Sequence, residues 1–100
     1  MPRVHKPAVP KDVFVAFDGL GIDSDPFVEG SEYFEVAQQL YNDVCGTIRI
    51  PRVRCTKAYD AETQTVLFMF HFDRPKWADK AAQRAALLKG ASVTVLESEE

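Results

Sequence analysis

The residues best suited to ligand binding in this sequence are one phenylalanine, Phe14, and a basic series formed by Arg49, Arg52, Arg54 and Lys57. An aromatic ring on an open sheet surface stacks on a nucleotide base, and guanidinium groups neutralise phosphate charge. The same combination of an apolar centre and flanking arginines also anchors protein partners. The ligand class indicated by these residues is therefore single-stranded RNA or protein.

A second group of candidates lies in the segment Thr65 to Phe72, which reads TVLFMFHF. Successive side chains of a strand point to opposite faces, so the phenylalanines share one face while Leu67, Met69 and His71 share the other. We expect the phenylalanines to point into the core. The predicted binding surface then comprises Phe14, Ala16, Arg49, Arg52, Arg54, Lys57, Leu67, Met69 and His71.

The sequence carries none of the familiar motifs for catalysis or metal binding, so we do not expect an enzyme. The sequence has no glycine-rich phosphate loop, no GxSxG and no HExxH. Carboxylates gather between Asp18 and Glu29 without the spacing of a calcium-binding loop, so we expect a solvated acidic loop. Cys45 and Cys55 have neither CxxC spacing nor nearby histidines, which predicts reduced thiols and no zinc site. We predict no catalytic residues, no metal and no cofactor.

Length and charge set the broad class. The chain has 100 residues, of which 46% are hydrophobic, and 12 basic against 15 acidic residues give a net charge of −3. These values are typical of one globular domain and argue against a protein that coats nucleic acid without sequence preference. No apolar run of about 18 residues and no secretory leader is visible, so we expect no membrane partner and an intracellular location, in the cytoplasm or nucleus.

The pattern of apolar residues predicts the elements that must position these side chains. Strands are expected at 12–17, 47–57, 65–72 and 92–96, with a bulge in the second at Pro51. One helix is expected to begin at the N-cap Ser31 and end at Gly46, and another to run from Asp73 and Pro75 to Gly90. A long loop covers 18–30, with a helical turn started by Asp25 and Pro26.

The domain boundaries follow from the same pattern. Residues 1–11 are predicted to form a flexible, basic, proline-rich arm, residues 12–96 the folded domain and residues 97–100 an acidic tail. The element order β-α-β-β-α-β predicts an α+β fold of the ferredoxin-like class. Right-handed crossovers give a four-stranded antiparallel sheet of strand order 4-1-3-2, with both helices on one face and the other face open.

The chain resembles the RNA recognition motif (RRM) family over roughly residues 12–96. Its segment VFVAFDGL is similar to the family's hexapeptide motif, with Phe14 at the stacking position, and TVLFMFHF occupies the place of the octapeptide motif. In the second predicted helix, Ala78, Ala81, Leu88 and Gly90 are similar to the family's pattern. The octapeptide positions Leu67 and Met69 lack the family's aromatic rings, which indicates an atypical member of the family or an unrelated ferredoxin-like domain.

The resemblance implies a non-catalytic module that binds single-stranded RNA through the open sheet face. The alternative is a protein-protein interaction domain, an adaptor or a small inhibitor. It would use the same apolar face, or the acidic loop with the first helix. The sequence leaves the oligomeric state open.

Overall fold

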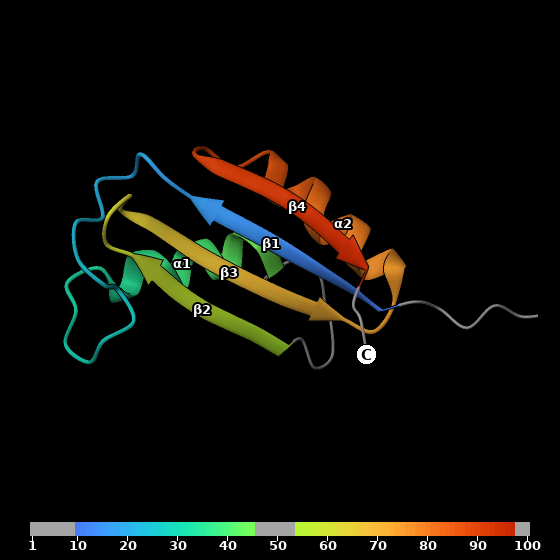
Figure 1. Ribbon diagram of the computed structural model, residues 1–100, viewed down its shortest axis with the longest axis horizontal. Helices are drawn as coiled ribbons and strands as arrows, with labels where there is room; N and C mark the ends of the chain where they lie inside the picture. The colour runs from blue at the N-terminus through green and yellow to red at the C-terminus, as the bar shows by residue number, and fades with distance from the viewer. Residues whose placement is uncertain (1–9, 46–53, 98–100) are drawn as a thin grey trace, which may run out of the picture.

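The computed structural model describes residues 10–45 and 54–97. Its strands are β1 (Lys11–Phe17), β2 (Arg54–Asp60), β3 (Thr65–Phe72) and β4 (Ala91–Glu97), and its helices are α1 (Phe34–Cys45) and α2 (Pro75–Ala86). The strands form a four-stranded sheet of order β2-β3-β1-β4, in which all neighbours are antiparallel (Figure 1). This is the predicted strand order read from the opposite edge. The predicted α+β class is confirmed.

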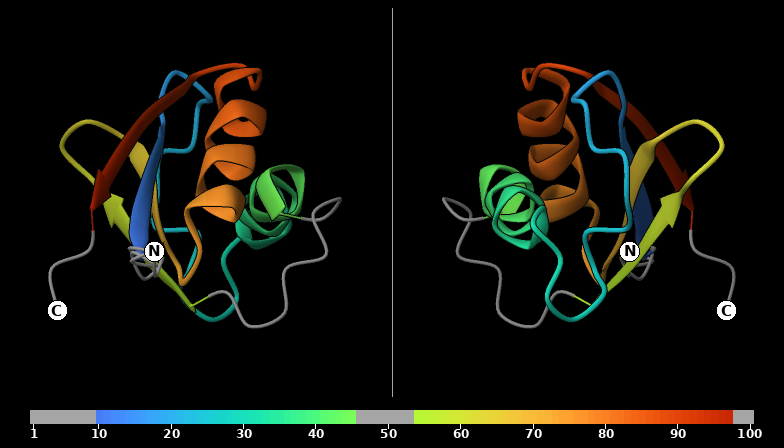
Figure 2. Two further views of the ribbon diagram at one scale, coloured as in Figure 1. Left: turned by 90° about the vertical axis from the view of Figure 1, so that its right-hand side faces the viewer. Right: turned by 90° about the vertical axis from the view of Figure 1, so that its left-hand side faces the viewer.

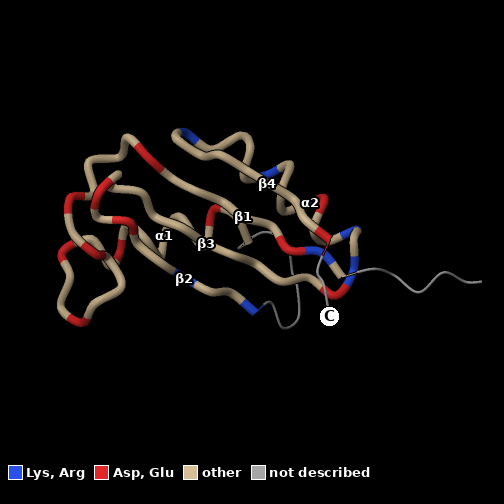
Figure 3. Tube along the Cα trace, in the orientation of Figure 1, with Lys and Arg blue, Asp and Glu red and all other residues tan. Residues whose placement is uncertain are grey.

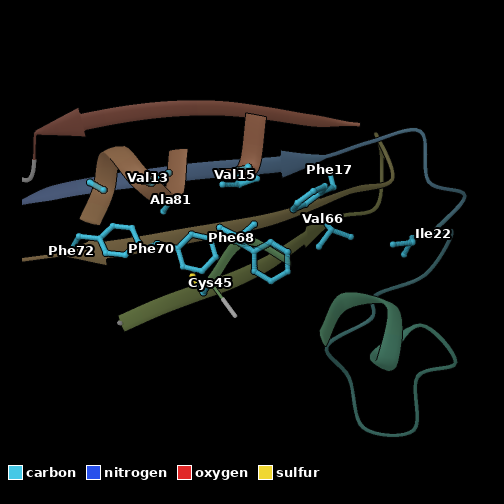
Figure 4. Packing of buried hydrophobic residues seen from close by; sticks show 13 residues of the cluster. Val13, Val15, Phe17, Ile22, Cys45, Val66, Phe68, Phe70, Phe72 and Ala81 are labelled. Carbon is cyan, nitrogen blue, oxygen red and sulfur yellow. The ribbon is translucent and has the colours of Figure 1, made fainter. Parts of the chain in front are cut away.

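Both helices lie on one face of the sheet (Figure 2). The strands bury alternate residues against them, because period-two alternation sends every second side chain to the same side. Phe68 and Phe70 are fully buried, and their rings stack with centroids 5.9 Å apart (Figure 4). Alanines at the sheet-facing positions of α2 let the helix backbone approach these large rings. The buried alanines of α2 are Ala78, Ala81 and Ala85.

The second strand extends further along the chain than predicted. It covers Arg54–Asp60, whereas the prediction ended at residue 57; residues 47–53, with the predicted bulge at Pro51, lie outside the described residues. Tyr59 belongs to the strand because it pairs with Val66 and its hydroxyl donates to the backbone oxygen of Ile22 at 2.7 Å. The hairpin turn is correspondingly short, and the Asp60 carboxylate accepts the backbone N–H of Glu62 at 3.0 Å.

The helix starts also differ by a few residues from the prediction. Ser31 does not begin α1; its hydroxyl accepts the N–H of Tyr33 at 3.2 Å in a separate turn, and the helix starts at Phe34. The second helix begins at Pro75, behind Arg74, without a side-chain cap. Lys11 and Glu97, placed in the predicted arm and tail, belong to strands. Residues 1–9 of the arm, residues 98–100 of the tail and Gly46 lie outside the described residues.

The loop between β1 and α1 is packed against the core. Ile22 is 2% exposed, and the ring of Phe27 meets Phe68 edge-on at 5.9 Å between centroids. Asp25 caps a single turn at Pro26 and Phe27, where the prediction placed one: its carboxylate accepts the N–H of Phe27 at 2.8 Å. The loop's acidic side chains form no cluster suited to a metal ion, as judged over the described residues. Neither described helix is long and apolar enough to cross a membrane.

Candidate functional site: the open sheet face

The face of the sheet opposite the helices carries the candidate site, which we call the open face. Its centre is formed by two residues of β1 directly opposite two residues of β3: Phe14 pairs with Met69, and Ala16 pairs with Leu67. Phe14 is 39% exposed and Leu67 38% exposed. We call Phe14, Ala16, Leu67 and Met69 the apolar patch. It is exposed because the described helices both cover the other side of the sheet (Figure 2).

Small polar and apolar side chains extend the patch onto the two edge strands. On β4, Thr94 stands opposite Phe14 and Ser92 opposite Ala16. The residues on β2 are Thr56, opposite Met69, and Ala58, opposite Leu67. None of these edge residues carries a charge, so the middle of the open face is a neutral, apolar surface.

A polar row crosses one end of the open face. His71 of β3 stands between Asp12 of β1 and Arg54 of β2 in the strand register. Its Nδ1 lies 2.7 Å from Asp12 Oδ1, and because an ionised carboxylate only accepts, the imidazole Nδ1–H donates. A shallow hollow of about 230 Å³ lies here, lined by Asp12, Arg54, Thr56, Met69 and His71.

The imidazole of His71 has one nitrogen without a hydrogen bond. This atom, Nε2, is buried and has no hydrogen-bond partner among the described residues; Asp73 Oδ1 lies 3.6 Å away. The Asp12–His71 pair ties β1 to β3 and gives the end of the open face a polar border.

The structure brings together six of the nine predicted site residues. Phe14, Ala16, Arg54, Leu67, Met69 and His71 all lie on the open face. Arg49 and Arg52 lie outside the described residues. Lys57 does not lie on the open face, contrary to the prediction. It lies on the helix-facing side of β2, and its Nζ is 4.9 Å from the centre of the Tyr41 ring on α1. It is three positions from Arg54, and an odd separation on a strand places two side chains on opposite faces.

Several residues of the open face were not predicted. They are Asp12, Thr56, Ala58, Ser92, Thr94 and Leu96. Leu96 is 49% exposed and stands opposite Asp12. Two signals point to them. Every second residue of a strand lies on the same face, and the strand register shows which residues of β2 and β4 lie beside Phe14 and Leu67.

The charge distribution over the fold is uneven (Figure 3). Acidic residues gather where the loop after β1, the start of α1 and the β2–β3 turn lie. They are Asp18, Asp23, Asp25, Glu29, Glu32, Glu35, Asp60 and Glu62. On the described open face, Arg54 is the one basic side chain, and the carboxylate of Asp12 stands near it. The face therefore has little net positive charge to attract phosphate.

The two cysteines lie on the other side of the sheet and are free thiols. Burial raises the pKa of Cys45 to about 12, with a smaller contribution from Cys55, and burial raises the pKa of Cys55 to about 11. A thiol that stays protonated at neutral pH is a poor nucleophile and metal ligand. Their role is packing.

Comparison with known proteins finds no relative: no family model, curated protein or solved structure matches this chain. The functional assignment therefore rests on the geometry of the open face.

Proposed function

We propose that this chain is a non-catalytic binding module of the ferredoxin-like class whose open face binds a protein partner through the apolar patch. The observation that carries the proposal is the juxtaposition of Phe14 with Met69 and of Ala16 with Leu67 on the two central strands, with Phe14 and Leu67 more than a third exposed. An exposed apolar centre with a polar border is typical of protein interaction sites.

The chemistry of the patch favours a partner that inserts apolar side chains. Phe14 offers a ring, and Leu67 and Met69 offer flexible aliphatic contact, which adapts to the shape of another protein. At the border of this centre, hydrogen-bonding groups come from Arg54 and from the Asp12–His71 pair. The two atoms of that pair, Asp12 Oδ1 and His71 Nδ1, lie 2.7 Å apart. We expect the partner to bury Phe14 and Leu67 at the middle of the contact.

The substitution Leu67→Arg tests the proposal. It places a charge in the middle of the patch, and a desolvated unpaired charge opposes association strongly. We expect capture of a partner from an extract of the source cells to be lost, while circular dichroism shows an unchanged fold because the side chain points to solvent. Leu87→Arg is the matched control: Leu87 is 86% exposed at the end of α2, so its charge leaves the open face intact.

These binding measurements distinguish the open face from the start of α1 as the contact surface. A partner that binds the wild type and Leu87→Arg but not Leu67→Arg supports the open face. If binding survives Leu67→Arg and is lost in Phe34→Glu, the contact lies at the start of α1, where Phe34 is 52% exposed beside acidic residues. That outcome contradicts the open-face proposal.

Single-stranded RNA is the second candidate ligand. The observation that favours it is the exposed ring of Phe14 at the centre of the sheet, on the same face as Arg54, in a chain that resembles the RRM family. Fluorescence anisotropy of a labelled single-stranded RNA of mixed sequence, at low and at high salt, tests it. RNA binding that needs Phe14, and is lost in Phe14→Ala, assigns the face to RNA; no binding at low salt removes this candidate.

A further inference from the structure

One edge of the sheet is built differently from the other. The outermost strand on the β1 side is β4, and no described segment pairs with its outer edge (Figure 1). From Ala91 to Leu96 this strand has no charge and no proline, and it contains two valines, a threonine and a leucine. Free edges of this composition are prone to pair with another strand. The opposite edge, β2, carries Arg54, Lys57 and Asp60, which oppose such pairing.

The strand register shows which backbone groups of β4 are free. The N–H of Asp18 donates to the oxygen of Gly90 at 3.1 Å, so Gly90 points its backbone groups toward β1. In an antiparallel ladder this direction alternates along the strand. Ser92, Thr94 and Leu96 therefore also face β1, while Val93 and Val95 direct their N–H and C=O groups outward. These outward groups are the ones that a further strand pairs with.

The side chains at this edge are also left uncovered. Val95 points to the helix side of the sheet, where a valine is normally buried, yet it is 38% exposed. On the open face, Leu96 is 49% exposed. The outermost strand therefore carries uncovered apolar side chains on both faces of the sheet.

We propose that two copies of this chain pair antiparallel through β4, about a two-fold axis at Thr94, to form one continuous sheet. This register places Thr94 opposite the Thr94 of the partner copy. Val93 of each copy then lies opposite Val95 of the other copy. The outward N–H and C=O groups of both valines then bond in two symmetric pairs. The valine side chains meet on the helix side, and Leu96 lies opposite the partner copy's Ser92 on the open face. Every position is matched to itself or to a compatible residue, as an isologous contact requires.

The helix above this edge leaves room for the second copy. Arg84 of α2 donates to the backbone oxygen of Asp43 on α1 at 3.0 Å, which fixes the side of α2 that faces α1. By helical spacing, Ala82 and Ala86 lie on the other side, toward the free edge of β4, together with Asp79, whose carboxylate lies 3.7 Å from Lys11 Nζ. Small residues there let α2 of the second copy approach across the axis.

The first test is the state of the full-length chain in solution. Sedimentation velocity over a wide concentration range is expected to show a reversible dimer. Val95→Pro removes an outward N–H without touching the ladder to β1, and we expect self-association to weaken about tenfold or more. Val95→Thr keeps the N–H and the shape and is expected to retain the dimer. A wild type that stays monomeric at every concentration overturns the proposal, as does assembly into open-ended aggregates.

The second test addresses the register. In an antiparallel pair without mutual hydrogen bonds, opposite Cα atoms lie about 4.5 Å apart, which suits a disulfide. Thr94→Cys is therefore expected to form a covalent dimer under mild oxidation. Ser92→Cys, exposed on the same face and strand, is the control: its two copies would lie about 14 Å apart in this register and are expected not to cross-link. Cross-linking of Ser92→Cys but not of Thr94→Cys overturns the register, and the wild type gives the background from Cys45 and Cys55.

Discussion

Gly90 is, among the described glycines, the one at which an added Cβ would meet a close neighbour. Its φ of +79° lies in the left-handed region, and a Cβ at this position would lie 2.5 Å from the backbone oxygen of Asp18. The same residue accepts the N–H of Asp18 at 3.1 Å, which joins the start of β4 to the end of β1. A side chain at this position would have to push the start of β4 away from the end of β1.

We expect Gly90→Ala to lower the free energy of unfolding by about 3 kcal/mol, from strain and clash together. Gly30→Ala is the control, since Gly30 has a φ of +80° but no atom near the added Cβ; its expected loss is about 1 kcal/mol. Urea denaturation followed by circular dichroism measures both. Equal losses in the two variants would show that the approach to Asp18 carries no cost of its own.

At the scale of elements, Tyr59 joins the loop after β1 to the edge strand β2. Its hydroxyl donates to the backbone oxygen of Ile22 at 2.7 Å, and Ile22 is 2% exposed. Tyr59→Phe leaves that oxygen without this donor, so we expect a loss of about 1 kcal/mol in unfolding free energy. Tyr33→Phe is the matched control, because the Tyr33 hydroxyl bonds Asp23 at 2.8 Å in an exposed position. A loss in Tyr33→Phe as large as in Tyr59→Phe contradicts this explanation.

The strands with one buried face were the predictable elements. In Thr65–Phe72 every second residue is large and apolar, and the predicted and observed boundaries of β3 agree. The end of β2 was predicted three residues too early because this strand has little such alternation: Arg54, Thr56, Lys57 and Ala58 are all exposed. Its position is set by contacts distant in sequence, such as Tyr59 with Ile22.

The candidate site was predictable to the same extent. Phe14, Leu67 and Met69 follow from alternation on two strands whose other faces are buried, and the structure places them together. Lys57 was assigned by its charge rather than by its parity along the strand, and parity decides the face. The Asp12–His71 hydrogen bond joins residues 59 positions apart, and only the register of β1 with β3 brings them together.

On the scale of the whole molecule, the two cysteines couple folding to pH. Cys45 is 9% exposed at the end of α1, and burial holds its pKa at about 12 against an ordinary value of 9.0. Burial, with the nearby thiols contributing less, also raises the pKa of Tyr41. In the unfolded chain these groups ionise at lower pH than in the native state. The native state then binds more protons than the unfolded state, and stability falls as pH rises.

We therefore expect the free energy of unfolding to be constant with respect to these groups below pH 9 and to fall between pH 9 and the folded-state pKa of about 12. The Cys45 thiol contributes a slope of at most about 1.4 kcal/mol per pH unit, one proton's worth. Urea midpoints measured across this range in the presence of a reductant give the slope. Cys45→Ala lowers stability at every pH by leaving a cavity, but it is expected to reduce the slope, because one titrating group is gone while Cys55 and Tyr41 remain. The same slope in the variant and the wild type would place the pH dependence elsewhere in the fold.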